Sequence, residues 1–242
     1  MARAGGKVSP AFAADYSVGV SENAVPGFLP SRQGFHFANR YPPGPTVKLG
    51  PLDPRWIGIG DASTGLCGGM CFTVRDLFEA GVDVPLDREP PANGSPRFQS
   101  IVRRQVVSLD WLRLPIRFWL RSALGGSFGG DRARTAFERE WPKIRREIDE
   151  GRLVMLGLLR VAALSPFKLT GNHQVIAFGY AEDGRGVTLR LYDSNWPDRD
   201  DVTATLRLDP ALRPSGLEQS TGEPLLGWFV APYSPADPRA WR

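Results

Sequence analysis

Residues 64–72, TGLCGGMCF, place a cysteine in a glycine-rich turn that leads directly into an amphipathic helical pattern. Over residues 71–81 the apolar side chains recur at helical spacing, and Gly81 marks the end of the pattern. The turn is therefore expected to present the thiol of Cys67 at the N-terminus of a helix. Amide dipoles at a helix start favour a thiolate, which makes Cys67 a candidate nucleophile. Cys71, one turn further along, is expected to be a buried core thiol.

Two later segments supply groups that suit the activation of this thiol. His173 begins the apolar run HQVIAFGY, and Asp193 and Asn195 follow in the segment LYDSNWP. Cysteine, then histidine, then a carboxylate or amide corresponds to a nucleophile, its base and the group that orients the base. For Trp196 two interpretations stay open, since its ring either shields the imidazole from water or fills the core.

The composition is that of an ordinary globular protein, with 42% hydrophobic and 23% charged residues among 242. The net charge of +4 is dispersed, and glutamates are interspersed among the arginines of residues 132–146, so no nucleic-acid partner is expected. No stretch approaches the roughly 18 consecutive apolar residues of a membrane span. The N-terminus lacks the apolar region of a secretory signal, and the expected location is the cytoplasm, where both cysteines are free thiols.

No cofactor and no metal are expected from the motifs of this chain. The two cysteines are separated by three residues and the two histidines are distant, which is not the usual zinc-ligand spacing. The glycine-rich segment 125–130 lacks the lysine and Ser/Thr of a phosphate-binding loop and is interpreted as a hinge. The oligomeric state is not decided by the sequence.

The chain is expected to consist of an arm and one domain. Residues 1–60 are rich in proline and glycine, which predicts an extended arm packed on the domain. Residues 61–242 then form a single domain, with a helical lobe over 61–150 and a β lobe over 151–242. Helices followed by strands place the protein in the α+β class.

Periodicity indicates the elements inside these two lobes. After the cysteine helix, one or two helices are expected over 97–124 with a break at Pro115, and another over 131–149 with Asp131 as its N-cap. The buried stripe of this last helix is expected to consist of Phe137, Trp141, Ile144 and Ile148. Five short apolar or alternating runs then predict an antiparallel sheet; they are 153–161, 174–180, 187–192, 202–208 and 225–230.

Three of these segments together resemble the papain-like cysteine peptidase superfamily, most closely its bacterial branch that includes the peptidases removing double-glycine leaders. The matching pieces are CGGMC at 67–71, HQVIAFGY at 173–180 and YDSN at 192–195. The resemblance covers roughly residues 60–80 and 150–208. It implies a papain-like fold, in which a helical lobe carries the nucleophile and a C-terminal antiparallel sheet or barrel carries the histidine and aspartate.

Carried over position by position, the resemblance implies that Cys67 is the nucleophile and that His173 is the general base and later acid. It makes Asp193 the group that holds the imidazole, with Asn195 as the alternate. The family usually has a glutamine six residues before the nucleophile, donating into the oxyanion hole, and Asp61 stands there in this chain. An ionised carboxylate cannot donate a hydrogen bond, so Asp61 either is protonated, has a different part or is not the aligned residue.

These features predict acyl transfer on a peptide or a small amide, ester or thioester through a Cys67 acyl-enzyme. Water as the second nucleophile makes the protein a peptidase or amidase. An amine as the second nucleophile makes it a transpeptidase or acyltransferase. The alternative is a catalytically inactive papain-like module that binds a peptide or small metabolite in the same cleft.

Overall fold

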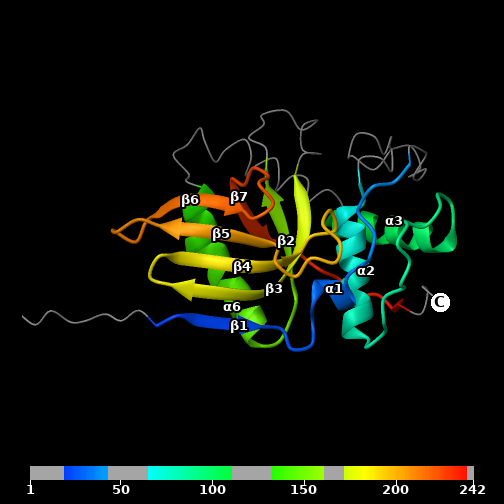
Figure 1. Ribbon diagram of the computed structural model, residues 1–242, viewed down its shortest axis with the longest axis horizontal. Coiled ribbons are helices and arrows are strands. Elements are labelled where there is room, and N and C mark those ends of the chain that lie inside the picture. Colours follow the sequence, from blue (N-terminus) through cyan, green and yellow to red (C-terminus); the bar gives the residue numbers. More distant parts are fainter. Residues whose placement is uncertain (1–18, 43–64, 111–131, 161–171, 239–242) are drawn as a thin grey trace, which may run out of the picture.

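The structure is a computed structural model of the 242-residue chain and describes residues 19–42, 65–110, 132–160 and 172–238. It combines helices with a curled antiparallel sheet, as the α+β prediction requires. Figure 1 shows the sheet on the left of the molecule, with α6 crossing behind its strands. The helices α2 and α3 lie on the right, beside the right-hand end of the strands. No helix in the described part of the chain is both long enough and apolar enough to cross a membrane.

The sheet has seven strands, and every strand pairing in it is antiparallel. Their order is β6-β5-β4-β3-β2-β7, and β1 pairs with β3 beside β2. The strands are β1 (Ser21–Ala24), β2 (Val154–Leu159), β3 (His173–Asp183), β4 (Gly186–Tyr192), β5 (Thr203–Leu208), β6 (Pro214–Gln219) and β7 (Gly227–Val230). The long strand β3 carries β2 along its first half and β1 along its second half.

The five predicted strands are confirmed as β2, β3, β4, β5 and β7, with shifts of a few residues at their ends. The strands β1, with the sequence SENA, and β6, with the sequence PSGLEQ, were not predicted. Neither has the apolar alternation that identifies a strand, and in β6 the residues Pro214 and Gly216 argue against one locally. Both form because a neighbouring strand offers backbone hydrogen-bond partners. The cause therefore lies in the tertiary structure and not in the local sequence.

Helix α2 (Cys67–Glu79) begins at the candidate nucleophile itself. Its buried face includes Phe72, Val74 and Leu77, as the amphipathic pattern predicts. The helix ends where Gly81 adopts a positive φ of 63°, and the N–H of Val82 then bonds to the carbonyl of Leu77 at 2.9 Å. This is the left-handed termination that glycine favours, so the predicted helix and its end are confirmed.

Helix α3 (Pro96–Ser108) packs across the first turn of α2. Ser95 caps its start, accepting a hydrogen bond from the N–H of Phe98 at 3.2 Å. A Cβ atom on Gly69 would lie 2.2 Å from the carbonyl oxygen of Ile101, so this helix crossing requires glycine. The rest of the predicted helical region, residues 111–124 with Pro115, lies outside the described residues, as do the predicted hinge at 125–130 and the cap at Asp131.

The next helix lies on one face of the sheet (Figure 1) and is formed by α5 (Arg132–Thr135), η4 (Ala136–Glu140) and α6 (Trp141–Asp149). Of the predicted stripe, Trp141, Ile144 and Ile148 are buried and Phe137 is partly buried. The ring of Trp141 meets that of Tyr180 at 4.9 Å. The π-helical turn η4 was not predicted. It precedes Pro142, which has no N–H to continue the ladder of α-helical hydrogen bonds.

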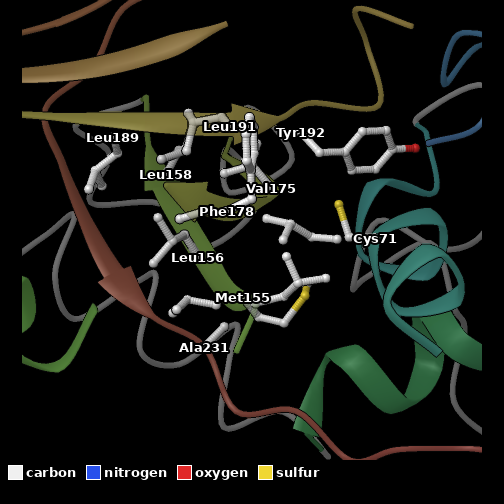
Figure 2. Packing of buried hydrophobic residues seen from close by; sticks show 14 of the residues in the cluster. Cys71, Met155, Leu156, Leu158, Val175, Phe178, Leu189, Leu191, Tyr192 and Ala231 are labelled. Carbon is white, nitrogen blue, oxygen red and sulfur yellow. The ribbon is translucent and has the colours of Figure 1, made fainter. Parts of the chain in front are cut away.

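The described part of the proline-rich N-terminal region, residues 19–42, contributes to the core through β1, through α1 (Pro30–Gln33) and through aromatic side chains. Phe28, for example, lies 5.1 Å from the ring of Phe78 on α2 and 5.5 Å from that of Phe178 on β3. This segment therefore joins the helical end of the molecule to the sheet. Figure 2 shows the core at that junction, where Cys71 of α2 extends toward Tyr192 at the end of β4.

Candidate active site

The structure brings Cys67 and His173 together, although more than a hundred residues separate them in the chain. Cys67 is the first residue of α2 and is partly exposed, and His173 is the buried first residue of β3. The imidazole of His173 hydrogen-bonds to the sulfur of Cys67. Strand β3 packs against α2, so its first residue lies beside the helix N-terminus.

Asp193 completes the cluster from the next strand. Its Oδ1 lies 2.6 Å from Nε2 of His173, which leaves Nδ1 of the ring for Cys67. Strand β4 runs antiparallel to β3, with Tyr192 opposite Ile176, so the residue that follows β4 arrives near the start of β3. The carboxylate is buried together with the imidazole, at 1% and 4% exposure of the two residues.

Asn195 and Trp196 lie in the turn that follows Asp193. The N–H of Asn195 donates to Oδ1 of Asp193 at 2.9 Å, whereas its side-chain oxygen accepts from Nδ2 of Asn39 at 3.3 Å. Of the two residues that could orient the imidazole, Asp193 is therefore the one that contacts it. Trp196 is partly buried against the core, and its indole N–H donates to Glu223 at 3.4 Å.

The electrostatics of this cluster favour a thiolate paired with an imidazolium. Burial opposes ionisation of all three groups, yet their mutual charges dominate. The pKa of Cys67 falls below its ordinary value because of the charge and hydrogen bond of His173. The paired charges of Asp193 and Cys67 raise the pKa of His173 to about 10. The imidazolium holds the pKa of Asp193 below its usual range.

Backbone N–H groups at the helix start reinforce the thiolate. The N–H groups of Gly68 and Gln174 both donate to the sulfur of Cys67 and lower its pKa further. The N–H of Cys67 itself meets no acceptor among the described residues, as is usual for the first amide of a helix. Asn39 holds the preceding peptide, with its Oδ1 accepting the N–H of Leu66 at 2.6 Å.

Cys71, the second thiol, has the surroundings of a core residue. It is fully buried, and its Sγ donates to the carbonyl oxygen of Gln174 at 3.4 Å. Burial, together with the negative charges of Cys67 and Asp193, raises its pKa well above the ordinary value. The structure thus places Cys71 where the sequence predicted a core thiol.

Four residues in contact with the site were not predicted from the sequence; they are Asn39, Arg160, Gln219 and Glu223. Asn39 bonds to both the Cys67 turn and the Asp193 turn, but nothing in its local sequence distinguishes it. Arg160 does carry a signal, because it is a charged residue directly after the wholly buried strand β2. A charge at the end of a buried strand indicates a specific partner in the fold.

Asp61, the residue aligned with the oxyanion glutamine, lies outside the described residues. Among the residues that the structure does describe, no group of three or more His, Cys, Asp or Glu side chains gathers in a way that could hold a metal ion. Both cysteines are free thiols. The side chains that the site itself brings together are those of Cys67, His173 and Asp193, with the neighbouring backbone amides.

Comparison with known proteins assigns neither a family nor a function to the chain. No protein-family model matches the chain, and neither a curated protein nor a solved structure matches it. The functional conclusion therefore depends on the residues and contacts of the site.

Proposed function

We propose that this protein is a cysteine enzyme with a papain-like arrangement, which transfers the acyl group of a peptide, amide, ester or thioester through a covalent Cys67 intermediate. The observation that carries the proposal is the chain of contacts from the sulfur of Cys67 through His173 to the buried Asp193, 2.6 Å from the imidazole. The order of parts also supports it: a cysteine at a helix start, a histidine at a strand start and an aspartate after the next strand.

The first half of the reaction uses the ion pair. The Cys67 thiolate attacks the carbonyl carbon of the substrate and forms a tetrahedral oxyanion, with the sulfur–carbon bond made and the carbonyl double bond opened. The intermediate collapses to a thioester and expels the leaving amine, alcohol or thiol. His173 donates its proton to that leaving group, and Asp193 keeps the ring oriented throughout.

The second half returns the enzyme to its starting state. Neutral His173 takes a proton from water or from an incoming amine, which attacks the thioester carbonyl. Collapse of the second tetrahedral intermediate breaks the sulfur–carbon bond and releases an acid or an amide. Cys67 leaves as the thiolate and His173 keeps the proton, so charges and protons balance over the cycle.

The helix N-terminus supports the oxyanion in both halves. The N–H of Cys67, the first amide of α2, is without an acceptor in the described part of the chain and is available to the developing negative charge. The helix dipole favours the same charge. These groups suit a tetrahedral intermediate formed at the sulfur they surround.

The chain offers a direct test, because its two cysteines allow matched single-thiol variants. Cys71→Ala retains only the Cys67 thiol, and Cys67→Ala retains only the Cys71 thiol. Each variant is incubated with a panel of nitrophenyl esters and aryl thioesters, and its intact mass is followed over time. We expect an acyl adduct on Cys71→Ala that later disappears by hydrolysis, and no adduct on Cys67→Ala.

Alkylation with iodoacetamide controls for substrate choice, since it reports thiolate reactivity without a binding pocket. Faster labelling of Cys67 than of Cys71 supports the activated nucleophile. Slow labelling of both thiols at similar rates, together with no acyl adduct from any donor, contradicts the enzyme proposal. That result would favour a catalytically inactive relative that binds a peptide or metabolite.

A further inference from the structure

Behind Asp193, on the side away from the imidazole, lies a second polar layer centred on Arg160. Arg160 follows β2 directly, and its side chain is 10% exposed. Its Nη2 lies 3.3 Å from Oδ2 of Asp193, 3.0 Å from Oε1 of Gln219 and 2.9 Å from Oε2 of Glu223. One guanidinium thus joins the carboxylate of Asp193 to Gln219, at the end of the edge strand β6, and to Glu223 in the segment between β6 and β7.

The two oxygens of Asp193 have separate sets of donors. Oδ1 accepts from Nε2 of His173 at 2.6 Å and from the N–H of Asn195 at 2.9 Å. Oδ2 accepts from Arg160 at 3.3 Å and from Nε2 of Gln219 at 3.2 Å. A carboxylate with two donors on each oxygen cannot rotate without losing hydrogen bonds, so Oδ1 stays directed at the imidazole.

Glu223 fixes the position of Arg160 from the opposite side. Both of its oxygens accept from the guanidinium, at 2.9 Å each, in a bidentate pair. Thr221 at 2.7 Å and the indole of Trp196 at 3.4 Å also donate to Oε2 of Glu223. Arg160 therefore lies between two carboxylates that would otherwise face each other across one partly buried site.

The backbone of Arg160 connects to the other side of the site. Its N–H donates to Oδ1 of Asn172 at 3.0 Å, and Asn172 is the residue immediately before His173. One residue thus contacts both the carboxylate and the segment that positions the base. A purely structural ion pair at a strand end would need only the contact with Glu223.

We propose that Arg160 is the positioning residue of this site: it holds Oδ1 of Asp193 toward His173, and Glu223 determines how much of its positive charge the cluster experiences. This inference rests on the proposed function for its catalytic meaning. The hydrogen-bond arrangement itself is testable without any substrate.

The charged and titratable groups around Asp193 determine the expected sign of each effect. In the described residues they are Cys67 and Cys71 from α2, His173 from β3, Tyr192 beside Asp193, and the Arg160–Glu223 pair. Loss of the positive charge of Arg160 favours the protonated form of every group nearby. Loss of the negative charge of Glu223 has the opposite effect.

The test uses NMR of the full-length protein labelled with ¹⁵N-histidine, together with the pH dependence of Cys67 alkylation by iodoacetamide. The chain has two histidines, so a His36→Gln variant assigns both sets of signals. In the unmodified protein we expect a slowly exchanging Nε2–H proton on His173, bonded to Asp193. In Arg160→Met this proton should exchange faster and broaden, and the midpoint of Cys67 alkylation should move up by roughly half a pH unit or more.

Three further variants make the result specific. Arg207→Met removes an exposed arginine that pairs with Glu218 between β5 and β6, and should change neither measurement. Arg160→Lys keeps the charge but loses the planar fork, so the alkylation midpoint should stay while the Nε2–H exchange still accelerates. The double variant Arg160→Met/Glu223→Gln removes both charges and so leaves no unpaired carboxylate, which provides a folded protein if Arg160→Met alone fails to fold. Its Cys67 alkylation midpoint should return toward that of the unmodified protein.

An Nε2–H signal and an alkylation midpoint that both remain unchanged in folded Arg160→Met would overturn the inference. In the double variant, whose midpoint is expected to stay near that of the unmodified protein, an unchanged Nε2–H exchange rate would overturn it. The failure of the proposed function gives a different result. In that case Cys67 of the unmodified protein labels no faster than Cys71, while the His173 signal still reports whether Arg160 holds Asp193.

Discussion

Cys67 and Cys71, at the two ends of the first turn of α2, carry the same side chain in different surroundings. Cys67 begins the turn, is partly exposed and has a lowered pKa, whereas Cys71 ends it, is fully buried and has a raised pKa. Helical phase places both thiols on the side of α2 that faces β3. Their difference therefore comes from what surrounds each sulfur: burial and the negative charges of Cys67 and Asp193 raise the pKa of Cys71, whereas the charge and hydrogen bond of His173 lower that of Cys67.

The peptide groups of Gln174 on β3 add to that difference. The N–H of Gln174 donates to Cys67, and its carbonyl oxygen accepts from Cys71 at 3.4 Å. A donor stabilises a thiolate, while an acceptor requires the proton to remain on the sulfur. His173, the residue before Gln174, adds a positive charge beside Cys67 alone. The charge of His173 and the backbone of β3 together distinguish the thiol at the helix start from the core thiol one helical turn away.

Removal of the His173 imidazole should reduce the difference in reactivity between the two thiols most strongly. In His173→Ala the Cys67 thiolate loses its charged partner, so its pKa returns toward the ordinary value of about 8.5. At neutral pH we expect Cys67 alkylation to slow by roughly 10- to 100-fold, with part of the loss offset by the greater nucleophilicity of a more basic thiolate. The measurement is the iodoacetamide rate in a Cys71→Ala background. His36→Ala serves as the control, since His36 pairs with Asp198 at 2.5 Å, and an equal loss there would contradict the assignment.

The pH dependence should sharpen the contrast between the two thiols. The pKa of Cys67 is lowered, so its labelling persists as the pH falls below the range of a free thiol and is lost only when the thiolate is protonated. Cys71 should label only at alkaline pH, if at all, because its pKa is raised. Acyl transfer, which also needs the proton of His173, should decline as the pH rises through about 10. Superimposable pH profiles for the two cysteines would count against this account.

A methyl group between the two cysteines should disturb the scaffold that separates them. In Gly69→Ala the new Cβ would lie 2.2 Å from the carbonyl oxygen of Ile101, a backbone atom that cannot move aside alone. We expect a loss of about 1–3 kcal/mol in the free energy of unfolding, as for other overpacked cores. Urea denaturation measures it, and Gly216→Ala is the matched control because a Cβ there has open space. Equal stability of the two variants would mean that α2 and α3 are not in close contact.

The smallest expected effect is on stability at the cysteines themselves. Cys71→Ala removes a buried sulfur and its hydrogen bond to Gln174, which should cost about 1 kcal/mol in the free energy of unfolding. Cys67→Ala should cost less, because its side chain is partly exposed and its pairing with His173 requires two buried charges. Denaturant midpoints of the two variants provide the comparison, and a larger loss from Cys67→Ala would reverse the roles assigned to the two thiols.

Local sequence patterns were sufficient to predict a helix or strand where the segment's own periodicity or end signals decide its structure. The helix from Cys67 with its end at Gly81, the buried stripe Trp141, Ile144 and Ile148, and five of the seven strands all carried such a signal. The strands β1 and β6 and the π-helical turn at Ala136–Glu140 did not, because backbone partners far along the chain, or one missing N–H at Pro142, decide them.

The candidate site divides in the same way. Cys67, His173 and Asp193 were recognisable because a thiol at a helix start, an imidazole at a strand start and a carboxylate after a strand are each marked locally. Local pattern alone left Asp193 and Asn195 both open as the partner of His173, and only the resemblance ranked Asp193 first. In the structure it is Oδ1 of Asp193 that lies 2.6 Å from Nε2 of His173. Asn39 and Glu223 were not predictable, because each acts through contacts with distant segments.

The sequence by itself determined the candidate reactive groups and the α+β class of the fold, since helix ends, apolar periods and residue chemistry are properties of short segments. Only the tertiary structure decided the pairing: the antiparallel register of β3 and β4 brings His173 to Asp193, and the packing of β3 on α2 brings His173 to Cys67. The shifted pKa values that result are properties of these contacts, because charges act over a few ångströms in space and not along the chain.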